Sequence, residues 1–402
     1  TRLDPRTLEP QPALAESWTS EEGGRAWRFR LRPGLRWSDG SPLGAEDLVR
    51  SWRRLRDPAT AAPYREWLAE LETLRAEGPA LLVRFRQPVP AFAEMCSYHA
   101  LAPVPPGLRR GEQPAGAVGN GPFRLVERRI RHRVLLEANP HYWDAAAVGL
   151  RSLEFRTVES QFTALNLFLT GEADFVPEVP SLAVPALLER ERERERAGLR
   201  PEFRPSPFLA TYFYRFNVTR PPLDDARVRR ALALALDREQ LAATLGGGQP
   251  AAASFVPPWI PGYAPPADVA DYDPARARAL LAEAGFPGGE GLPELELLFN
   301  SAELHRDVAE VMQAQWRAEL GVRTRLLNQE WKVFLDAQRG LDYELSRSSW
   351  IADYRDPATF LEIFRDGSPN NRTGWRSAAY ERLLDRARAG AAPAERMALL
   401  QE

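Results

Sequence analysis

A regular alternation of strand and helix patterns over residues 295 to 351 constrains the fold of this chain more than any other feature. Apolar residues first alternate with polar ones, then recur at helical spacing, and this succession repeats. The strand positions are Leu295, Leu297 and Phe299, then Val322, Thr324 and Leu326, and finally Tyr343, Leu345 and Arg347. The helix positions between them are Leu304, Val308, Val311, Met312 and Leu320, closed by Gly321, and then Trp331, Phe334 and Leu335. A β-α-β-α-β series of this kind predicts a parallel sheet with right-handed crossovers.

The predicted sheet indicates where a ligand would bind. Ligands of open α/β sheets lie beyond the carboxyl ends of the strands. His305 follows the first of these strands, and the segment from Arg347 to Asp353 follows the last. We therefore expect three charged or chargeable residues at the same edge of one sheet.

The pair Arg347 and Asp353 allows two interpretations. The two side chains can neutralise each other, or they can hold the two ends of one zwitterion. Asp353 can also cap a helix or a turn, or pair with Arg355. Arg347 is harder to explain by structure alone, because an Arg in a buried strand is rarely without an anionic partner. The structural alternatives for the other candidates are core packing for Trp331 and Trp350, and an ordinary first-turn helix position for His305.

The first half of the chain is less regular, and its size adds a constraint. Its clearest patterns are a strand with Trp27, Phe29 and Leu31, a helix with Leu48, Trp52 and Leu55, and a strand with Leu81, Val83 and Phe85. A single core rarely serves more than ~250–300 residues, so a chain of 402 residues is expected to hold two or more domains. The net charge of −2 provides no general attraction to nucleic acid.

The sequence holds no motif of a recognisable catalytic chemistry. H-E-x-x-H, paired C-x-x-C, a phosphate loop and G-x-S-x-G are all missing. The four His residues are scattered without metal-ligand spacing, and Cys96 is the only cysteine. We expect no enzyme, no cofactor and no metal site. No apolar run approaches the ~18 residues of a membrane span, and no signal peptide is visible.

Five segments together resemble the periplasmic oligopeptide-binding proteins of bacterial ABC importers, within the peptide/nickel family of extracellular solute-binding proteins. They are Leu31-Arg-Pro-Gly-Leu-Arg-Trp-Ser-Asp-Gly-Ser-Pro42, Asn139-Pro-His-Tyr-Trp-Asp144, Phe216-Asn217 with Asp225-Ala-Arg-Val-Arg-Arg-Ala-Leu-Ala-Leu-Ala-Leu-Asp-Arg238, Leu327-Asn-Gln-Glu-Trp-Lys332 and Arg347-Ser-Ser-Trp-Ile-Ala-Asp-Tyr-Arg-Asp-Pro357. The similarity runs from about Leu3 to the end of the chain.

The resemblance implies an α/β fold of the bilobal periplasmic-binding-protein type, with two mixed α/β lobes. Lobe one would span residues 1–207, with an inserted subdomain at about 13–105, and lobe two residues 208–402. The implied function is capture of short oligopeptides in a closing cleft and their delivery to the permease of an ABC importer. The protein would be a monomer in the periplasm, or lipid-anchored at the outer face of the cytoplasmic membrane.

The resemblance also assigns roles to the charged candidates. Asp353 matches the residue that pairs with the peptide α-amino group. Arg347 matches one that receives the carboxylate of short peptides, and His305 one that receives the carboxylate of longer peptides. A desolvated ammonium needs an anionic partner, and the fork of an Arg suits a carboxylate.

Other positions match the family's main-chain contacts and pockets. Ser349 and Ile351 match residues whose backbone pairs with the peptide in strand fashion, which explains broad specificity because main-chain bonds ignore side-chain identity. The side chains expected near roomy pockets are those of Trp331, Trp350 and Tyr64.

The chain departs from the family pattern at several places. The segment after Leu3 is short, so a strand that bonds the peptide on its other side is expected to be missing. A C-terminal segment that returns to lobe one is also expected to be missing. The family's disulfide pair is replaced by Ala210 and Ile351, a basic position by Gln338, and an acidic position by Arg215. The ligand therefore stays open: a dipeptide, a murein peptide or a metal chelate remains an alternative, as does a truncated relative that acts as a sensor or scaffold.

Overall fold

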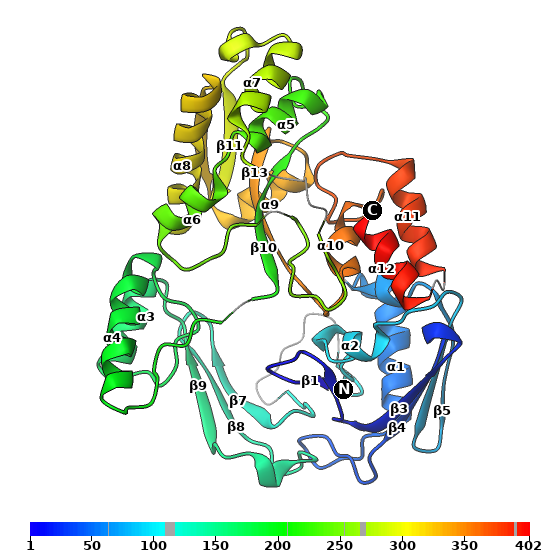
Figure 1. Cartoon of the computed structure of the whole chain (residues 1–402). Coiled ribbons are helices and arrows are strands. Elements are labelled where there is room, and N and C mark those ends of the chain that lie inside the picture. Colours follow the sequence, from blue (N-terminus) through cyan, green and yellow to red (C-terminus); the bar gives the residue numbers. More distant parts are fainter. Residues whose placement is uncertain (63, 109–116, 207, 253, 266–270, 390–391) are drawn as a thin grey trace. The chain divides into compact units, whose positions relative to one another are not determined.

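The computed structural model describes residues 1–62, 64–108, 117–206, 208–252, 254–265, 271–389 and 392–402 (Figure 1). The chain divides into two compact units, each with its own hydrophobic core. The first unit consists of Thr1–Glu159, Asp353–Arg355 and Arg386–Arg396, and the second of Ser160–Ala352, Asp356–Asp385 and Met397–Glu402.

Antiparallel sheets dominate the first unit. Its four-stranded sheet has the order β3-β4-β6-β5. The bounds are β3 (Ala15–Glu21), β4 (Ala26–Leu31), β5 (Leu71–Glu77) and β6 (Ala80–Phe85). Helix α1 (Ala45–Arg56) packs against β5 and β6. The alternation in β4 places Trp27, Phe29 and Leu31 in the core, so the two strands and the helix predicted here are confirmed.

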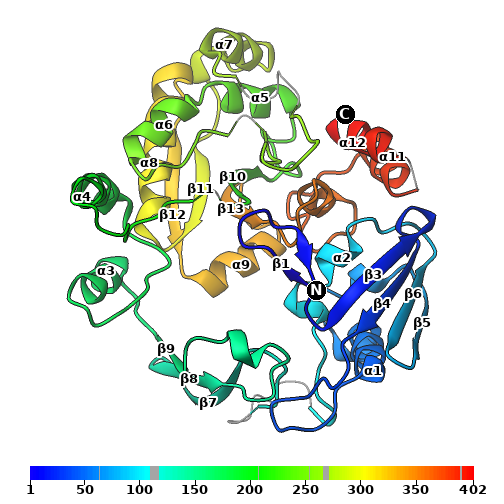
Figure 2. The ribbon, with the colours of Figure 1, turned by 60° about the horizontal axis from the view of Figure 1, so that its bottom comes forward.

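The remaining elements of the first unit are a second sheet, a short helix and a strand pair. The sheet has the order β7-β8-β9, with β7 (Phe123–Arg129), β8 (Arg133–Ala138) and β9 (Ser152–Arg156). Helix α2 (Phe92–Met95) packs in the core. The hydroxyl of Thr1 donates to the carbonyl of Ala93 in α2 (2.7 Å), which holds the N-terminus beside that helix (Figure 2).

The first eleven residues form more structure than the sequence predicted. Strand β1 (Arg2–Leu3) pairs antiparallel with β2 (Pro10–Gln11). Arg355 binds the turn between them, because its Nη1 donates to the carbonyl of Thr7 (2.6 Å) and its guanidinium lies 3.6 Å from the Glu9 carboxylate. The N-terminal turn is therefore attached to the segment Asp353–Arg355 within the same unit.

A mixed four-stranded sheet organises the second unit, with the order β10-β13-β11-β12. The strands are β10 (Ala210–Phe216), β11 (Leu295–Asn300), β12 (Thr324–Gln329) and β13 (Leu345–Ile351). Strand β11 is parallel to β12 and to β13, so the predicted β-α-β-α-β unit is confirmed. The sequence interpretation missed β10, which pairs antiparallel with β13 along seven residue pairs.

Helices cover both faces of this sheet. Leu295, Leu297 and Phe299 pack with the helices α5, α7 and α8 in the larger core, whereas Leu298 packs with Phe334 of α9 on the other face. The α-helices that lie wholly in the unit are α3 (Gln161–Leu169), α4 (Val184–Arg196), α5 (Ala226–Leu234), α6 (Arg238–Leu245), α7 (Pro274–Glu283), α8 (Glu303–Leu320), α9 (Trp331–Arg339) and α10 (Ala358–Leu361). Helices α11 (Ala378–Arg388) and α12 (Pro393–Gln401) are divided between the two units, because Arg386–Arg396 belongs to the first.

Gly321 ends α8, as predicted from the sequence. Its φ of +67° lies in the left-handed region. A Cβ at this position would come within 2.2 Å of the Gly288 carbonyl oxygen. Glycine is therefore needed here both for its backbone conformation and for the close approach of another chain segment.

The two compact units do not follow the expected lobe boundaries. They change over between Glu159 and Ser160, whereas the sequence interpretation placed the change after Pro207, which lies outside the described residues. Compactness alone does not define a body that moves as one. The lobe boundaries and the inserted subdomain at 13–105 therefore stay predictions.

Candidate functional site

Strand β13 has one fully paired edge and one edge that is mostly open. Strand β10 pairs with all of β13, and Ala210 lies directly opposite Ile351, so the two positions that replace the family's disulfide are neighbours. On the other side, β11 pairs only with Leu345 and Ser346. The edge from Arg347 onward has no strand beside it within the described residues.

The hydrogen-bond pattern shows which backbone groups face this open edge. The N–H of Ala352 donates to the Leu209 carbonyl (2.9 Å), and the carbonyl of Glu344 accepts from the N–H of Asn217 (2.9 Å). Even-numbered residues of β13 therefore turn their backbone groups toward β10. Since successive residues of a strand alternate, Ser349 and Ile351 turn theirs toward the open edge. Both residues are also exposed, which is the geometry that a strand-like ligand requires.

Arg347 lies near the carboxyl end of β11. Its Nη1 donates to Asn300 Oδ1 (3.2 Å), and its guanidinium carbon lies 4.9 Å from the centre of the Tyr212 ring. Its Nε is buried and has no hydrogen-bond partner in the described part of the chain. Arg347 also makes no ion pair with a carboxylate of the described residues in its own unit. A half-buried cation with an unpaired Nε donor is suited to bind an anion.

His305 lies in the first turn of α8, close to Arg347 and Tyr212. It is 8% exposed, and its Nδ1 lies 3.2 Å from the Tyr212 hydroxyl. Burial, and then the nearby charge of Arg347, lowers the pKa of His305 to about 4. The imidazole is therefore neutral at pH 7 and acts through hydrogen bonding. We call His305, Arg347, Asn300 and Tyr212 the Arg347 cluster.

Asp353 lies in the first unit, among aromatic side chains. Burial raises the pKa of Asp353 above its ordinary value, although a hydrogen bond from the Tyr98 hydroxyl opposes the shift. The Tyr98 oxygen lies 2.8 Å from that of Tyr64. The rings of Tyr64 and Trp67 are 4.9 Å apart, and those of Trp67 and Tyr354 are 5.7 Å apart. A carboxylate among aromatic rings is suited to an ammonium group.

The two Trp candidates differ in their surroundings. Trp331 is 52% exposed and stacks on Phe334 within α9, with ring centres 5.7 Å apart. Trp350 packs beside a small core of Val256, Ile260, Tyr263 and Phe360. Its indole Nε1 is buried without a hydrogen-bond partner among the described residues. The role of either Trp as a pocket wall stays a prediction.

Sequence reasoning missed three residues that shape these groups: Tyr212, Asn300 and Tyr98. A signal for Tyr212 was present, because residues 210–216 are rich in aromatic residues and alternate as a strand does. The contacts of Tyr98 and Asn300 depend on chain segments that only folding brings together.

Arg215, a departure from the family pattern, lies on the opposite face of β10 from Tyr212 and Tyr214. It is 5% exposed, its Nη1 donates to the Asn370 carbonyl (2.8 Å), and its guanidinium carbon lies 5.3 Å from the centre of the Phe213 ring. Burial lowers the pKa of Arg215 to about 10. Arg215 thus belongs to the interior of the second unit and does not join the Arg347 cluster.

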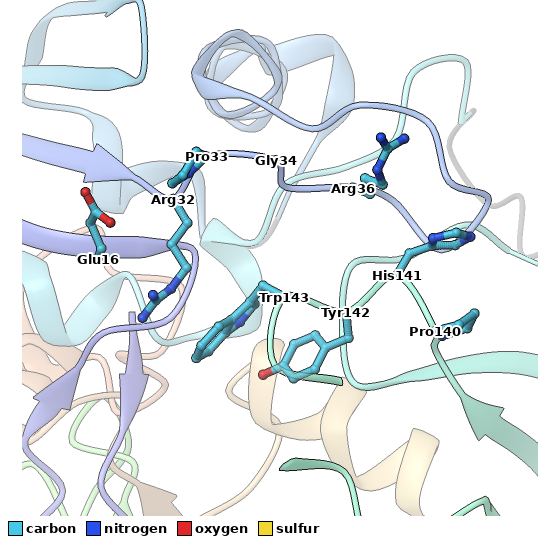
Figure 3. A pocket seen from close by; sticks show the side chains of 9 residues that line it. All are labelled: Glu16, Arg32, Pro33, Gly34, Arg36, Pro140, His141, Tyr142 and Trp143. Carbon is cyan, nitrogen blue, oxygen red and sulfur yellow. The ribbon is translucent and has the colours of Figure 1, made fainter. Parts of the chain in front are cut away.

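A surface pocket of about 600 Å³ in the first unit is lined by Glu16 of β3 and by two of the segments that carry the family resemblance (Figure 3). Arg32 covers the Trp143 ring, with its guanidinium carbon 4.1 Å from the ring centre. A Cβ at Gly40 would lie 3.2 Å from His141 Nε2, so the segments are in close contact. None of the predicted site residues lines this pocket, and these two motifs act in packing.

The described residues form neither a metal site nor a helix that could span a membrane. Among the residues that the structure describes, no three His, Cys, Asp or Glu side chains are arranged to hold a metal ion. None of the described helices combines the length and apolar character that crossing a membrane requires.

Comparison with known proteins identifies close relatives. Residues 9–372 match the model of bacterial extracellular solute-binding proteins, family 5. The chain is 34% identical to the probable deoxycholate-binding periplasmic protein YgiS of Escherichia coli, over 98% of this chain and 77% of that protein. It is 32% identical to the periplasmic oligopeptide-binding protein OppA of Salmonella typhimurium, over 93% of this chain and 73% of that protein.

Solved structures agree with the sequence matches. A periplasmic oligopeptide-binding protein of Borrelia burgdorferi superimposes with a TM-score of 0.86 at 29% identity, covering 99% of this chain and 83% of that one. Haemophilus influenzae OppA in complex with the peptide RPPGFSPFR gives a TM-score of 0.83 at 28% identity, covering 100% and 82%. The expected α/β fold class of periplasmic binding proteins is confirmed.

Proposed function

Since the chain belongs to the family of bacterial extracellular solute-binding proteins, family 5, we propose that it captures short peptides and delivers them to the permease of an ABC importer. The observation that carries this proposal is the open edge of β13. Ser349 and Ile351 present exposed backbone groups there, and an extended peptide can add to such an edge as a strand. Main-chain pairing accepts many side chains, which suits an importer of mixed peptides.

The charged groups of the site complement the two ends of a peptide. Asp353 binds the α-amino group, because a carboxylate that burial has made costly to ionise gains most from a cationic partner. Arg347 binds the carboxylate of a short peptide with its guanidinium, whose Nε has no partner among the described residues. His305, neutral at pH 7, contributes a hydrogen bond to the carboxylate of a longer peptide.

The proposal includes the setting in which the protein acts. It works as a monomer, in the periplasm or anchored by lipid outside the cytoplasmic membrane, with the permease and the peptide as its partners. It is a binding protein without enzymatic activity, cofactor or nucleic-acid partner. The names of its relatives support the periplasmic setting and the peptide ligand, since OppA proteins are described as periplasmic and oligopeptide-binding. The walls of the side-chain pockets include Tyr64, Trp331 and Trp350.

Native mass spectrometry of the purified protein tests the function directly. We expect a heterogeneous set of co-purified short peptides that addition of an excess of a single tripeptide displaces. A single non-peptide ligand would refute the proposal. Deoxycholate is the first such compound to test, because one relative is named as a probable deoxycholate-binding protein. Failure of every tested peptide to bind would also refute it.

A further inference from the structure

The open edge of β13 is closed at Arg347 by the side chain of Gln338. Gln338 Nε2 donates to the carbonyl oxygen of Arg347 (2.9 Å) and to Ser346 Oγ (2.8 Å). The Arg347 carbonyl faces the same edge as Ser349, because the two residues are two apart in the strand. The amide of Gln338 therefore takes the place that the N–H of an added strand would need.

The position of Gln338 is held by further buried contacts. Its Oε1 accepts from Arg372 Nη1 (3.1 Å), and the Arg372 carbonyl accepts from the hydroxyl of the buried Tyr343. Arg only donates and a carbonyl only accepts, so this amide has a single favourable orientation. Gln338 is 2% exposed, and displacing it would leave polar groups buried without partners. We call Gln338, Ser346, the Arg347 carbonyl and Arg372 the Gln338 clasp.

Building on the proposed function, we infer that the Gln338 clasp sets a length limit: the edge of β13 pairs with three ligand residues and no more. A ligand that runs antiparallel to β13 places its first residue opposite Ile351 and its third opposite Ser349. A fifth residue would fall opposite Arg347, whose carbonyl is already taken. The carboxylate of a tripeptide then lies closest to the guanidinium of Arg347, whose Nε is unpaired among the described residues. Tripeptides are the ligands that use every free group of this edge.

Calorimetry with alanine peptides of two to five residues tests the length limit on the wild-type protein. We expect affinity to rise about tenfold from the dipeptide to the tripeptide, and to change by less than about threefold from the tripeptide to the pentapeptide. N-methylation of the third residue's amide should weaken binding about tenfold. N-methylation of the fifth residue's amide should change it less than about twofold, and this ligand series needs no protein variant.

Two variants assign the limit to the clasp. Gln338→Met keeps the side-chain volume but removes the Gln338 donor from the Arg347 carbonyl, which keeps only the longer contact from Ser346 Oγ (3.4 Å). The pentapeptide should then gain about fivefold over the tripeptide, the factor that one net hydrogen bond provides. Ser346→Ala is the matched control, because it removes one partner of Gln338 and the longer Ser346 Oγ contact to the Arg347 carbonyl (3.4 Å) but leaves the Gln338 donor on that carbonyl. Its length profile should equal that of the wild type.

The outcomes separate this inference from the proposed function. Absence of binding at every length refutes the function. Binding that improves by about threefold or more from three to five residues in the wild type overturns the length limit alone. An unchanged length profile in a folded Gln338→Met variant overturns it as well. If that variant does not fold, the N-methyl series on the wild type decides.

Discussion

Replacing Asp353 by Asn should separate the peptide ammonium site from ordinary structural roles of a carboxylate. Loss of one member of a desolvated charge pair costs about 2–5 kcal/mol. Asp353 is half-buried, so the lower part of that range applies, about 2–3 kcal/mol. This corresponds to a loss of affinity of about 30- to 150-fold for a free tripeptide. Isothermal titration calorimetry of the wild type and the variant measures this difference.

The same variant should be more stable than the wild type when no ligand is present. Burial raises the pKa of Asp353 in the folded protein above the unfolded value. The folded state therefore binds this proton more tightly, and the stabilising contribution is lost as the pH rises through the folded pKa. At pH 7 the charged carboxylate lowers stability, and Asn removes this cost. A higher melting temperature together with weaker binding is the expected signature.

One control is a modified ligand, and the other is a substitution of an exposed carboxylate. An N-acetylated tripeptide lacks the ammonium, so it should bind poorly and about equally to both forms. Asp342, whose carboxylate is 81% exposed, provides the matched variant Asp342→Asn, which should leave affinity unchanged. Equal affinity of wild type and Asp353→Asn for a free tripeptide would refute the assignment of Asp353 to the amino group.

Three further predictions concern the Arg347 cluster and the core. Arg347→Met should weaken binding of a free tripeptide by about 2–5 kcal/mol in calorimetry, but a C-terminally amidated tripeptide by much less; equal losses for both would contradict a carboxylate role. Folding lowers the pKa of His305 from 6.5 to about 4. Between these pH values the unfolded state binds more protons than the folded state. The free energy of unfolding should therefore fall by up to about 3 kcal/mol as the pH drops from 6.5 to 4. Urea unfolding of His305→Gln should show a smaller pH dependence. Trp316 is buried and its Nε1 donates to the Leu232 carbonyl (2.8 Å), so Trp316→Ala should cost about 3–5 kcal/mol in the same assay.

Local patterns explain which parts of the fold could be predicted. The strands β11, β12 and β13 and the helices α8 and α9 were predicted because apolar residues recur in each with the period of its element, two in a strand and 3.6 in a helix. Strand β10 carried a similar alternation but was missed, and with it the Tyr212 ring beside Arg347. The predicted meeting of His305 and Arg347 follows from a general property of parallel sheets, whose carboxyl ends share an edge.

The sequence by itself determined the strand–helix alternation, the sheet edge that brings His305 and Arg347 together, and the family. These follow from side-chain periodicity and from short motifs, which are local. The tertiary structure alone decided which backbone groups of β13 remain open, because that depends on where β11 stops pairing and on the Gln338 side chain that reaches the Arg347 carbonyl. It also decided that Tyr98 donates to Asp353, a contact between residues far apart in the chain. Hydrogen bonds act over about 3 Å, so only the folded chain settles which groups are paired and which are left for a ligand.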